Sequence, residues 1–524
     1  MCNVAMYGLG CDTDMAADLQ ISTCADAKHE ILHKRFGFTS FRLGQEQIVD
    51  WLATGQHVLA VMPTGAGKSL CFQVPALMRG GLCVVVSPLV ALMKDQVEGL
   101  KLDGISAETI NSSQSRDDNV AIWRRVAAGE VAFLYLSPER LMDQRMLAAL
   151  AKLPIGLIAV DEAHCISQWG ASFRPEYDAL QGLRVALPDV PIGAFTATAD
   201  SATQRDIALK LFGGRAQVHV AGFDRPNIRL CVARKDNSAR QLLDFVEGHK
   251  GESGIVYALS RKRTEKLAEE LNDAGHRALA YHAGLSAENR AETQNLFMTE
   301  PGLVICATIA FGMGIDKPDV RFVFHADLPS TLEAYYQEIG RAGRDGEAAE
   351  AYMIFGMEDA AKRRRFIQQE DSDETRRRAE GIRLSRLVDF AEAKTCRRQA
   401  LLAYFGQGSE ACDNCDNCLG ISANAAPRRK KKEQREAVMR EAVAGGVDEG
   451  LLQRLKALRF KLAQKRKVPA YVIFHDRVLI EMARAKPLTE MDMGNISGVG
   501  PAKLEQFGAA FLREIAAHLE QDFA

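Results

Sequence analysis

The segment His57-Val-Leu-Ala-Val61 runs directly into Met62-Pro-Thr-Gly-Ala-Gly-Lys-Ser69, and an apolar pattern with helical spacing follows. A buried strand, a glycine-rich loop and a helix in this order are typical of a P-loop, whose backbone N–H groups surround phosphate oxygens. The strict pattern begins with glycine, whereas this loop begins with Met62. The alternative is a glycine turn ahead of a helix that binds no phosphate.

The residues of this loop have distinct expected roles. Two glycines let the backbone curl so that successive N–H groups point inward. A lysine at this position reaches the β- and γ-phosphates, and the hydroxyl beside it binds Mg²⁺. The nucleotide-binding candidates are Thr64, Gly65, Gly67, Lys68 and Ser69, and Ser69 is also a candidate magnesium ligand.

Two adjacent acids follow a second apolar run. Ile158-Ala-Val160 is a buried-strand pattern, and Asp161 and Glu162 come directly after it. Ligands of open α/β sheets bind at this carboxyl edge of the strands. We expect Asp161 to hold Mg²⁺ and Glu162 to polarise the attacking water. A solvated turn is the alternative, and the P-loop upstream counts against it.

Phosphoryl transfer also needs positive charge on the developing transition state. The segment Gln337-Glu-Ile-Gly-Arg341-Ala-Gly-Arg344-Asp-Gly346 offers two arginines three residues apart. On a helix this spacing places both on one face, from which they could point across a cleft. The alternative is that they are ordinary surface charges.

Length, composition and charge set limits on the protein. The 524 residues are about three times the ~150 residues of a typical domain, so we expect several domains. Apolar residues make up 47% and charged residues 26%, which is ordinary globular composition. A net charge of −2 means that any surface for nucleic acid must be local. Without a long apolar stretch or a secretory signal, we expect a cytoplasmic protein with no membrane partner.

The chain alternates strand-like and helical patterns from about residue 29 to 355, which predicts an α/β fold of βαβ units on parallel sheets. A basic helical region, a charged linker and an all-helical module follow. The expected strands are His57–Val61, Cys83–Val86, Ala132–Leu136, Gly156–Val160, Gly193–Phe195, Gly254–Tyr257, Leu303–Ala307 and Phe322–His325. The expected divisions are an extension at 1–28, α/β halves at 29–221 and 222–355, a helical metal-binding region at 356–420, a basic linker at 421–447 and a helical module at 448–524.

Four of the twelve cysteines form a cluster. Cys396 is followed after fifteen residues by Cys412, and Cys415 and Cys418 each follow after two more. In a reducing compartment such spacing indicates metal rather than disulfides. Four thiolates suit a closed, tetrahedral, structural Zn²⁺ site. An iron–sulfur cluster held by the same four thiolates is the alternative.

At this point the sequence resembles superfamily 2 helicases, and more specifically the RecQ family of DNA helicases. The likeness covers about residues 30–420 and resumes at about 450–520. The segments that carry it are Phe36–Gln45, Ser87–Gln96, Asp161–Gly170, Phe173–Tyr177, Thr196–Thr198, Ala310–Lys317 and Tyr335–Arg344. It implies two RecA-like domains, a helical zinc-binding subdomain and a small HRDC-like domain at the C-terminal end, with ATP, Mg²⁺ and structural Zn²⁺ as cofactors.

The resemblance also implies roles for individual residues. Phe38, Arg42 and Gln45 would stack on and read adenine, Arg344 would be the arginine finger, and Arg341 would contact the γ-phosphate. The loop 167–177 is similar to the family's aromatic-rich loop, which couples DNA binding to hydrolysis. Aromatic faces stack on bases without sequence choice, so Trp169, Phe173, Arg174 and Tyr177 form a candidate single-strand platform. Thr198 is the further candidate for a DNA contact, and burial of Trp169 and Phe173 in a core is the alternative.

One part of the family pattern is missing. A winged-helix domain of about a hundred residues usually follows zinc in this family, whereas only Leu419 to about Val447 separates the cysteines from the last module. Without a winged helix, we do not expect the family's usual binding of duplex DNA. The basic run 428–432 is either a partial replacement or a solvated spacer. In the last module, Gly498, Gly500 and Lys503 could bring N–H groups close to phosphate, or the module could bind protein.

The resemblance thus implies a Mg²⁺- and ATP-dependent helicase that moves 3′ to 5′ on single-stranded and partly duplex DNA. The expected context is DNA repair and recombination, with repair proteins as partners and, in a bacterium, association with the nucleoid. One alternative is an RNA helicase on the same core. The other is a nucleic-acid binding or annealing protein with vestigial catalysis, against which Lys68, Asp161, Glu162 and Arg344 all count.

Overall fold

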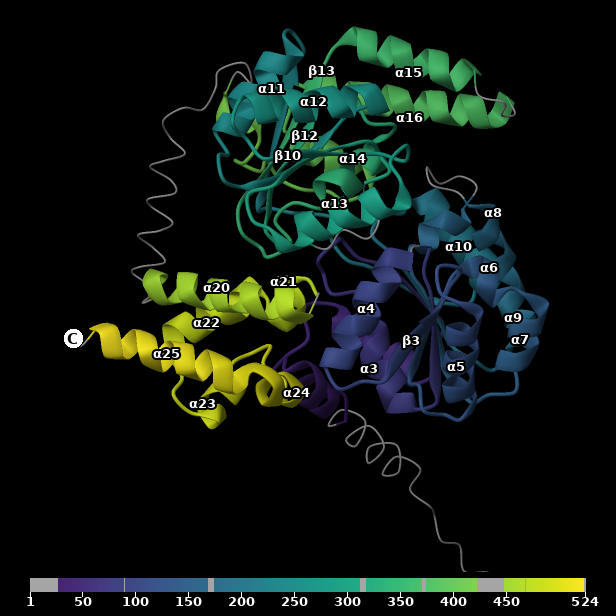
Figure 1. Ribbon diagram of the computed structural model, residues 1–524. Helices are drawn as coiled ribbons and strands as arrows, with labels where there is room; N and C mark the ends of the chain where they lie inside the picture. Colours follow the sequence, from purple (N-terminus) through teal and green to yellow (C-terminus); the bar gives the residue numbers. More distant parts are fainter. Residues whose placement is uncertain are drawn as a thin grey trace, which may run out of the picture.

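In this computed structural model, residues 27–88, 90–167, 174–311, 317–369, 374–421, 447–466 and 468–522 are described. Two parallel β-sheets, each with helices on both faces, form two lobes that lie one above the other, and the helical C-terminal module packs beside the lower lobe (Figure 1). This is the α/β architecture that the alternation of strand and helix patterns predicts. None of the described helices is both long and apolar enough to cross a membrane.

The first lobe contains a seven-stranded parallel sheet in the order β3-β4-β2-β5-β6-β1-β7. Its strands are β1 (Val58–Val61), β2 (Leu82–Val86), β3 (Ala107–Ile110), β4 (Phe133–Leu136), β5 (Ile155–Val160), β6 (Ile192–Thr196) and β7 (Gln217–Val220). The central strands are short apolar runs because helices cover them on both sides. A helix over residues 27–36 precedes α2 (Gln45–Ala53), α3 (Leu70–Arg79), α4 (Val90–Leu102), α5 (Arg116–Ala127), α6 (Pro138–Leu141), α7 (Gln144–Leu150), η1 (Ala163–Ile166), α8 (Pro175–Asp178), η2 (Ala179–Gly182), α9 (Leu183–Ala186) and α10 (Ser201–Phe212).

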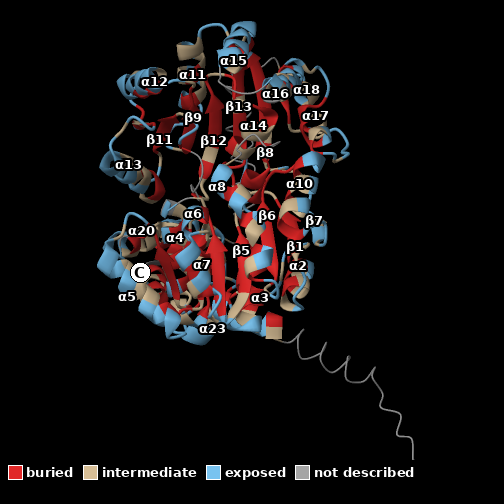
Figure 2. Cartoon of the chain, turned by 90° about the vertical axis from the view of Figure 1, so that its right-hand side faces the viewer, coloured by how far each residue is buried: buried red, intermediate tan, exposed pale blue. Residues whose placement is uncertain are grey.

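The second lobe contains a six-stranded parallel sheet in the order β10-β11-β9-β12-β13-β8. The strands are β8 (Ile228–Arg234), β9 (Ser253–Tyr257), β10 (Ala278–Tyr281), β11 (Val304–Ala307), β12 (Val320–His325) and β13 (Ala349–Phe355). The helices are α11 (Ser238–Glu247), α12 (Arg261–Asp273), α13 (Ala287–Thr299) and α14 (Leu332–Ile339). Figure 2 shows most strands of both sheets as buried, inside partly exposed helices.

All eight strands expected from the sequence lie in the two sheets, but five further strands were not predicted. These are β3, β7, β8, β10 and β13. The strand β7 lies where the sequence carries no motif, pairs in parallel with β1 and closes the edge of the first sheet. Its residues are largely exposed, so it lacks the continuous apolar run by which a buried strand is found.

The helical region that follows packs on the second lobe. Its helices are α15 (Met357–Gln369), α16 (Glu374–Glu392), α17 (Arg397–Tyr404) and α18 (Asp416–Leu419). Leu384 and Leu387 of α16 are buried in the same apolar cluster as the second-lobe residues Tyr335 and Ile339. The segment that carries Cys415 forms a bridge to Leu230 of β8, so the region is continuous with this lobe.

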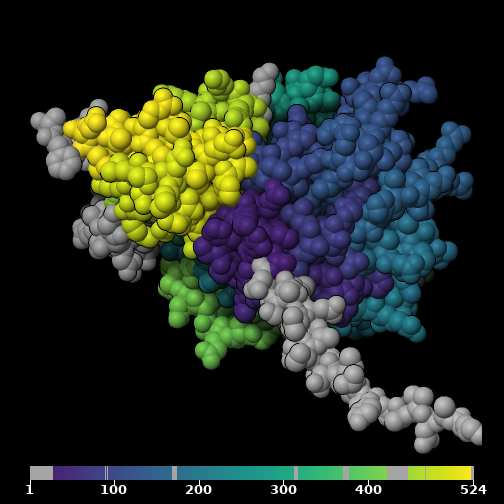
Figure 3. Space-filling model, turned by 90° about the horizontal axis from the view of Figure 1, so that it is seen from below, coloured from purple at the N-terminus to yellow at the C-terminus, as the bar shows by residue number. Residues whose placement is uncertain are grey.

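The C-terminal module has a core of its own, and its helices are α20 (Glu449–Arg466), α21 (Ala470–Ile473), α22 (Asp476–Ala485), α23 (Glu490–Gly494), α24 (Pro501–Lys503), the π-helical turn η3 (Leu504–Gly508) and α25 (Ala509–Asp522). The module lies against the N-terminal part of the first lobe (Figure 3). The Gly498 N–H donates to the Gly37 carbonyl (2.6 Å), and Lys503 pairs with Asp103 (3.0 Å). The expectation that the edge at Gly498, Gly500 and Lys503 offers N–H groups to phosphate is wrong for this arrangement. The first lobe packs against that edge and accepts the Gly498 N–H.

Candidate nucleotide-binding cleft and zinc centre

The loop after β1 has the conformation of a phosphate-binding loop. Gly65 and Gly67 have φ angles of 80° and 79°, which side chains with a Cβ rarely adopt. Met62 has no positive φ and is buried, so the departure from the strict glycine pattern causes no backbone strain. Lys68 Nζ donates to the Met62 carbonyl (3.1 Å), and Ser69 immediately precedes α3, where helix N-terminal N–H groups favour an anion.

The three residues assigned to adenine lie beside this loop. Arg42 Nη1 donates to the Gly65 carbonyl (2.7 Å), and Gln45 Nε2 donates to the carbonyls of Ala66 (2.9 Å) and Gly67 (3.1 Å). Gln45 Oε1 accepts from the Arg42 N–H (2.8 Å), and Phe38 packs partly buried against the same lobe. Burial, with a smaller contribution from nearby Arg477, lowers the pKa of Arg42. The side-chain amide of Gln45 is thus bonded to the P-loop in this structure.

The acidic pair lies at the carboxyl edge of β5. Burial and then the charge of Glu162 raise the pKa of Asp161 to about 7, and Lys68 opposes this shift. A bound cation beside a carboxylate favours its ionised form, so such a buried acid is suited to hold a metal ion. Glu162 has a φ of 49° and lies 3.3 Å from His164 Nδ1. Ser69 and Asp161 supply a hydroxyl and a carboxylate, the oxygen ligands that Mg²⁺ prefers.

The two lobes contact each other directly at the cleft. Gln337 Nε2 of α14 donates to Thr198 Oγ1 (2.6 Å) and lies 3.4 Å from His164 Nε2. His164 Nδ1 is in turn 2.9 Å from Thr196 Oγ1. The acidic strand end, the segment after β6 and α14 are therefore joined by polar contacts. Thr198 is buried in this cleft and not on an exposed surface, so it does not present itself to DNA in this arrangement.

The two arginines do not share a helical face, and that expectation is wrong. The helix α14 ends at Ile339, before both arginines, and the turns that carry them contain Gly343 and Gly346 with φ of 57° and 89°. Arg344 nevertheless lies against the P-loop, with its Cβ 3.7 Å from the place that a Cβ on Gly65 would take. Arg341 is buried in the second lobe beside the Tyr257 hydroxyl, whose pKa burial raises to about 12.

The aromatic-rich loop is described only in part. Trp169 and Phe173 lie outside the described residues, whereas Arg174 immediately precedes α8. Tyr177 is fully buried, and its hydroxyl donates to the Asp161 carbonyl (3.0 Å). Its expected place in a base-stacking platform is therefore wrong, because no face of the ring reaches solvent. The residue instead supports the strand end that carries the acidic pair.

The four clustered cysteines come together in space. One sulfur from each of Cys396, Cys412, Cys415 and Cys418 lies within 4.8 Å of the others. In a tetrahedral site with Zn–S bonds of about 2.3 Å, the sulfurs are about 3.8 Å apart, so this set fits Zn²⁺ after a small contraction. Asp416 links the cluster to β8 by accepting from the Val232 N–H (3.0 Å).

Sequence reasoning missed one residue of the cleft. Arg225 lies between β7 and β8 and donates to the carbonyls of Thr64 (3.0 Å) in the P-loop and Gly343 (2.8 Å) in the arginine-bearing loop. The sequence offers no signal for this role beyond a single basic residue in the connection between the lobes.

Family models match four parts of the chain. They are described as DEAD/DEAH box helicase at residues 42–207, helicase conserved C-terminal domain at 235–346, RecQ zinc-binding at 357–419 and HRDC domain at 448–515. The zinc-binding match includes all four cysteines of the cluster and favours zinc over an iron–sulfur cluster.

Curated relatives match over nearly their whole length. The chain is 36% identical to the ATP-dependent DNA helicase RecQ of Pasteurella multocida, with 97% of this chain and 96% of the relative covered. It is 32% identical to the protein of the same name from Bacillus subtilis, with 93% and 98% covered. The Pasteurella alignment spans 609 positions, more than the 524 residues of this chain, so that relative contains residues for which the chain has no counterpart.

Solved structures agree on the fold. A structure of the DEAD-box helicase Mss116 is 16% identical with a TM-score of 0.53, and the match covers 72% of this chain and 89% of that one. The Lhr helicase of Mycobacterium smegmatis is 20% identical with a TM-score of 0.51, covering 70% and 54%. With two RecA-like lobes, a four-cysteine zinc centre and a C-terminal HRDC domain, the chain belongs to the RecQ family of ATP-dependent DNA helicases.

Proposed function

We propose that this protein couples the hydrolysis of Mg²⁺-ATP to 3′-to-5′ movement on single-stranded DNA, and so unwinds DNA during repair and recombination. The observation that carries the proposal is the close approach of the P-loop and the arginine-bearing loop, with Gly65 facing Arg344 across the cleft. Relatives named ATP-dependent DNA helicase RecQ support DNA as the substrate. We place the enzyme in the cytoplasm, where chromosomal DNA is accessible in a bacterium.

The cleft has the groups that phosphoryl transfer needs. The P-loop N–H groups and Lys68 would bind the β- and γ-phosphates, and Ser69 and Asp161 would hold Mg²⁺, which neutralises charge on the phosphate oxygens. Glu162 would orient the attacking water, and Arg344 would stabilise charge on the transferred group. Because these groups come from both lobes, hydrolysis requires the lobes to be closed.

Closure also offers a way to couple hydrolysis to movement. The bond from Gln337 to Thr198 joins the lobes close to the acidic pair, so a change at the γ-phosphate can alter the distance between the lobes. A strand held by both lobes would then be advanced by alternating grips. Arg174, at the edge of the aromatic-rich loop, and the loop itself are the proposed link between DNA and the acidic pair.

Basic side chains on the zinc-binding region would add contacts to the phosphate backbone. The helices α15 and α16 expose Lys362, Arg364, Arg365, Arg377 and Arg378. Contacts of this kind give affinity without sequence preference and weaken as salt increases. The chain has too few residues between the zinc centre and the HRDC domain for a winged helix, so we expect weak discrimination in favour of forked or four-stranded DNA.

Two measurements test the proposal. Lys68→Ala should bind a single-stranded oligonucleotide with unchanged affinity but lose DNA-stimulated ATP hydrolysis, since its target is the nucleotide phosphates. Duplexes with a 3′ or a 5′ single-stranded tail should separate only with the 3′ tail and only with ATP and Mg²⁺. Undiminished turnover in Lys68→Ala, or strand separation without ATP, contradicts the proposal.

An RNA helicase is the second candidate, because one relative, 39% identical over 75% of this chain, carries the name putative ATP-dependent RNA helicase. The zinc centre and the greater number of relatives named DNA helicases favour DNA. ATP hydrolysis measured with DNA and RNA strands of one sequence separates the two. Stimulation by RNA that equals or exceeds stimulation by DNA would favour the RNA activity.

A further inference from the structure

Arg225 joins the two loops that face each other across the cleft. Its Nη1 donates to the carbonyls of Thr64 (3.0 Å) and Gly340 (3.3 Å). Its Nη2 donates to the carbonyls of Ala342 (2.9 Å) and Gly343 (2.8 Å). Thr64 belongs to the P-loop of the first lobe, whereas the other three acceptors belong to the turns that carry the two arginines of the second lobe. One planar guanidinium therefore connects both loops.

The geometry of this group suits a connection of fixed length. A guanidinium is planar, always charged and offers five N–H donors in a fixed arrangement, so four bonds to carbonyls define its position closely. Asn227 supports the same loop from the second lobe, with Nδ2 donating to the Gly343 (2.8 Å) and Glu347 (2.9 Å) carbonyls. Asn227 has no bond to the P-loop, whereas Arg225 does.

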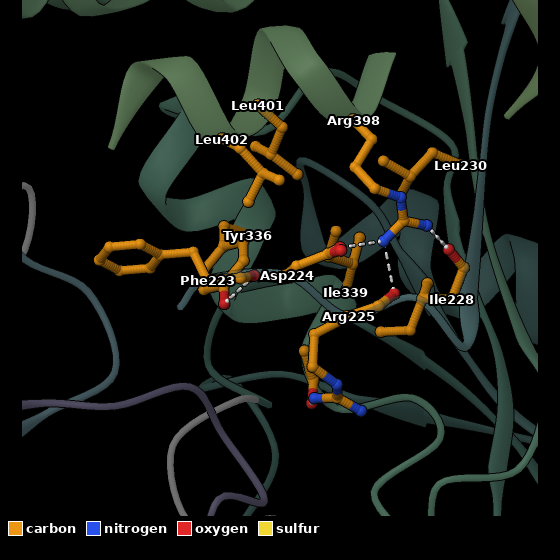
Figure 4. Close-up of a pocket in the computed structure, with 11 residues that line it drawn as sticks. Phe223, Asp224, Arg225, Ile228, Leu230, Tyr336, Ile339, Arg398, Leu401 and Leu402 are labelled. Atoms are coloured by element: carbon orange, nitrogen blue, oxygen red, sulfur yellow. Dashed lines mark hydrogen bonds and ion pairs between the residues drawn. The ribbon is translucent and has the colours of Figure 1, made fainter. Parts of the chain in front are cut away.

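The main chain that carries Arg225 is fixed by the zinc-binding region. Arg398 of α17 donates from Nη1 to Asp224 Oδ1 and to the Arg225 carbonyl, both at 2.6 Å, and from Nη2 to the Ile228 carbonyl at 2.6 Å (Figure 4). The zinc-binding region is thereby linked to the P-loop through two arginines.

Apolar packing also holds this segment. A small pocket lined by side chains that include Phe223, Tyr336 and Leu401 separates the segment from α14 and α17 (Figure 4). The Tyr336 hydroxyl donates to the Phe223 carbonyl (2.8 Å), and Phe223 stacks on Phe405 with ring centroids 4.6 Å apart. The backbone before Arg225 is thus tied to the helix that precedes the arginine-bearing loop.

We propose that Arg225 is a positioning residue for ATP hydrolysis. It holds the arginine-bearing loop against the P-loop so that Arg344 contacts the γ-phosphate. The inference rests on the proposed ATP hydrolysis and adds a residue to it. The bond to Thr64 forms only when the lobes are close, whereas the three bonds within the second lobe remain when they separate. Arg225 therefore stabilises the closed geometry in which the transition state forms, through main-chain carbonyls of both loops.

The test is a comparison of turnover with nucleotide binding in the full chain. Arg225→Ala should lower kcat for DNA-stimulated ATP hydrolysis on the order of 100-fold, because a displacement of about 1 Å at a reacting group costs that much. The Kd for a fluorescent ADP analogue, measured directly, should stay within about threefold, since the P-loop still binds phosphate. Arg215→Ala, which changes an exposed arginine of the first lobe, is the matched control.

A conservative variant separates positioning from folding. Arg225→Lys keeps the charge but replaces the planar guanidinium with a single ammonium group. This variant should recover only part of kcat and should unfold at the same temperature as the wild type. Unchanged kcat in Arg225→Ala overturns the proposal, as does a loss of nucleotide affinity equal to the loss of kcat. A wild-type protein without DNA-stimulated hydrolysis would instead refute the ATPase function itself, so the two failures are distinguishable.

Discussion

The docking of the HRDC domain on the first lobe depends on few polar contacts, and Lys503→Ala removes one of them. Lys503 pairs with Asp103 at 3.0 Å, and the two side chains are only 15% and 16% exposed. Burial raises the pKa of Asp103 and the charge of Lys503 opposes this, so the carboxylate depends on its partner. Among the described residues, further polar contacts are the backbone bond from the Gly498 N–H to the Gly37 carbonyl and the bond from Gln506 to the Leu102 carbonyl (3.3 Å).

The expected size of the effect follows from the charge left behind. A buried acceptor that loses its partner costs about 1–3 kcal/mol, and the cost is larger for charged groups. Taking about 2 kcal/mol, the ratio of docked to undocked molecules should fall about 30-fold, since 1.36 kcal/mol corresponds to a factor of ten. The HRDC domain itself should stay folded, because Lys503 lies outside its apolar core.

Amide hydrogen exchange of the full chain measures this directly. Peptides that contain Gly498 should exchange faster in Lys503→Ala, because the Gly498 N–H donates to the Gly37 carbonyl across the interface, whereas peptides from the core of α20 and α25 should not change. Lys461→Ala, at an exposed position of α20, is the control. A double variant with Lys503→Asp and Asp103→Lys should recover part of the protection. Unaltered exchange of the Gly498 amide in Lys503→Ala would refute the reasoning.

Four further outcomes are expected. Gly67→Ala should weaken ADP binding at least about tenfold, since a positive φ costs a residue with a side chain about 1–2 kcal/mol and the new Cβ would contact Gln45. The control is Gly129→Ala, because Gly129 also has a positive φ, of 75°, but a Cβ there would meet no other atom. Tyr177→Phe should lower the free energy of unfolding by about 1 kcal/mol, since it leaves the Asp161 carbonyl without its donor; an unchanged Tm contradicts this. Cys415→Ser should reduce bound zinc measured by metal analysis; full occupancy would exclude Cys415 as a ligand. Burial alone would raise the pKa of Asp476, but Arg459 and Lys456 lower it to about 2. The contribution of this carboxylate to stability is therefore present above pH 4 and is lost as the pH falls towards 2. In urea unfolding, Asp476→Asn should lack this pH dependence of the free energy of unfolding.

The features predicted correctly from the sequence are those encoded by neighbouring residues. Buried parallel strands such as β2 and β5 are continuous apolar runs, and so they can be found without knowledge of their partners. The P-loop and the cysteine cluster likewise depend on short spacings along the chain. Strands such as β7, which is exposed at the sheet edge, carry no such run and were missed.

The errors occurred where the surroundings decide the role of a residue. An aromatic residue in a polar segment is equally consistent with stacking on a base and with burial, and Tyr177 is buried because the end of β5 packs against α8. Arginines three apart share a face only on a helix, and α14 ends at Ile339, before both Arg341 and Arg344. The sequence leaves a phosphate contact and a protein contact equally open for Lys503, because the docking of its domain on the first lobe cannot be read from its own segment.

Arg225 shows why a motif search finds the groups that face the phosphates but not those that align them. All four of its acceptors are main-chain carbonyls, which every residue possesses, so the amino acids at Thr64, Gly340, Ala342 and Gly343 carry no mark of the contact. The loops that it joins are about 280 residues apart in the chain and become neighbours only when both sheets have formed. A residue of this kind is recognisable only from tertiary structure, and its substitution should affect turnover while every phosphate-binding motif remains intact.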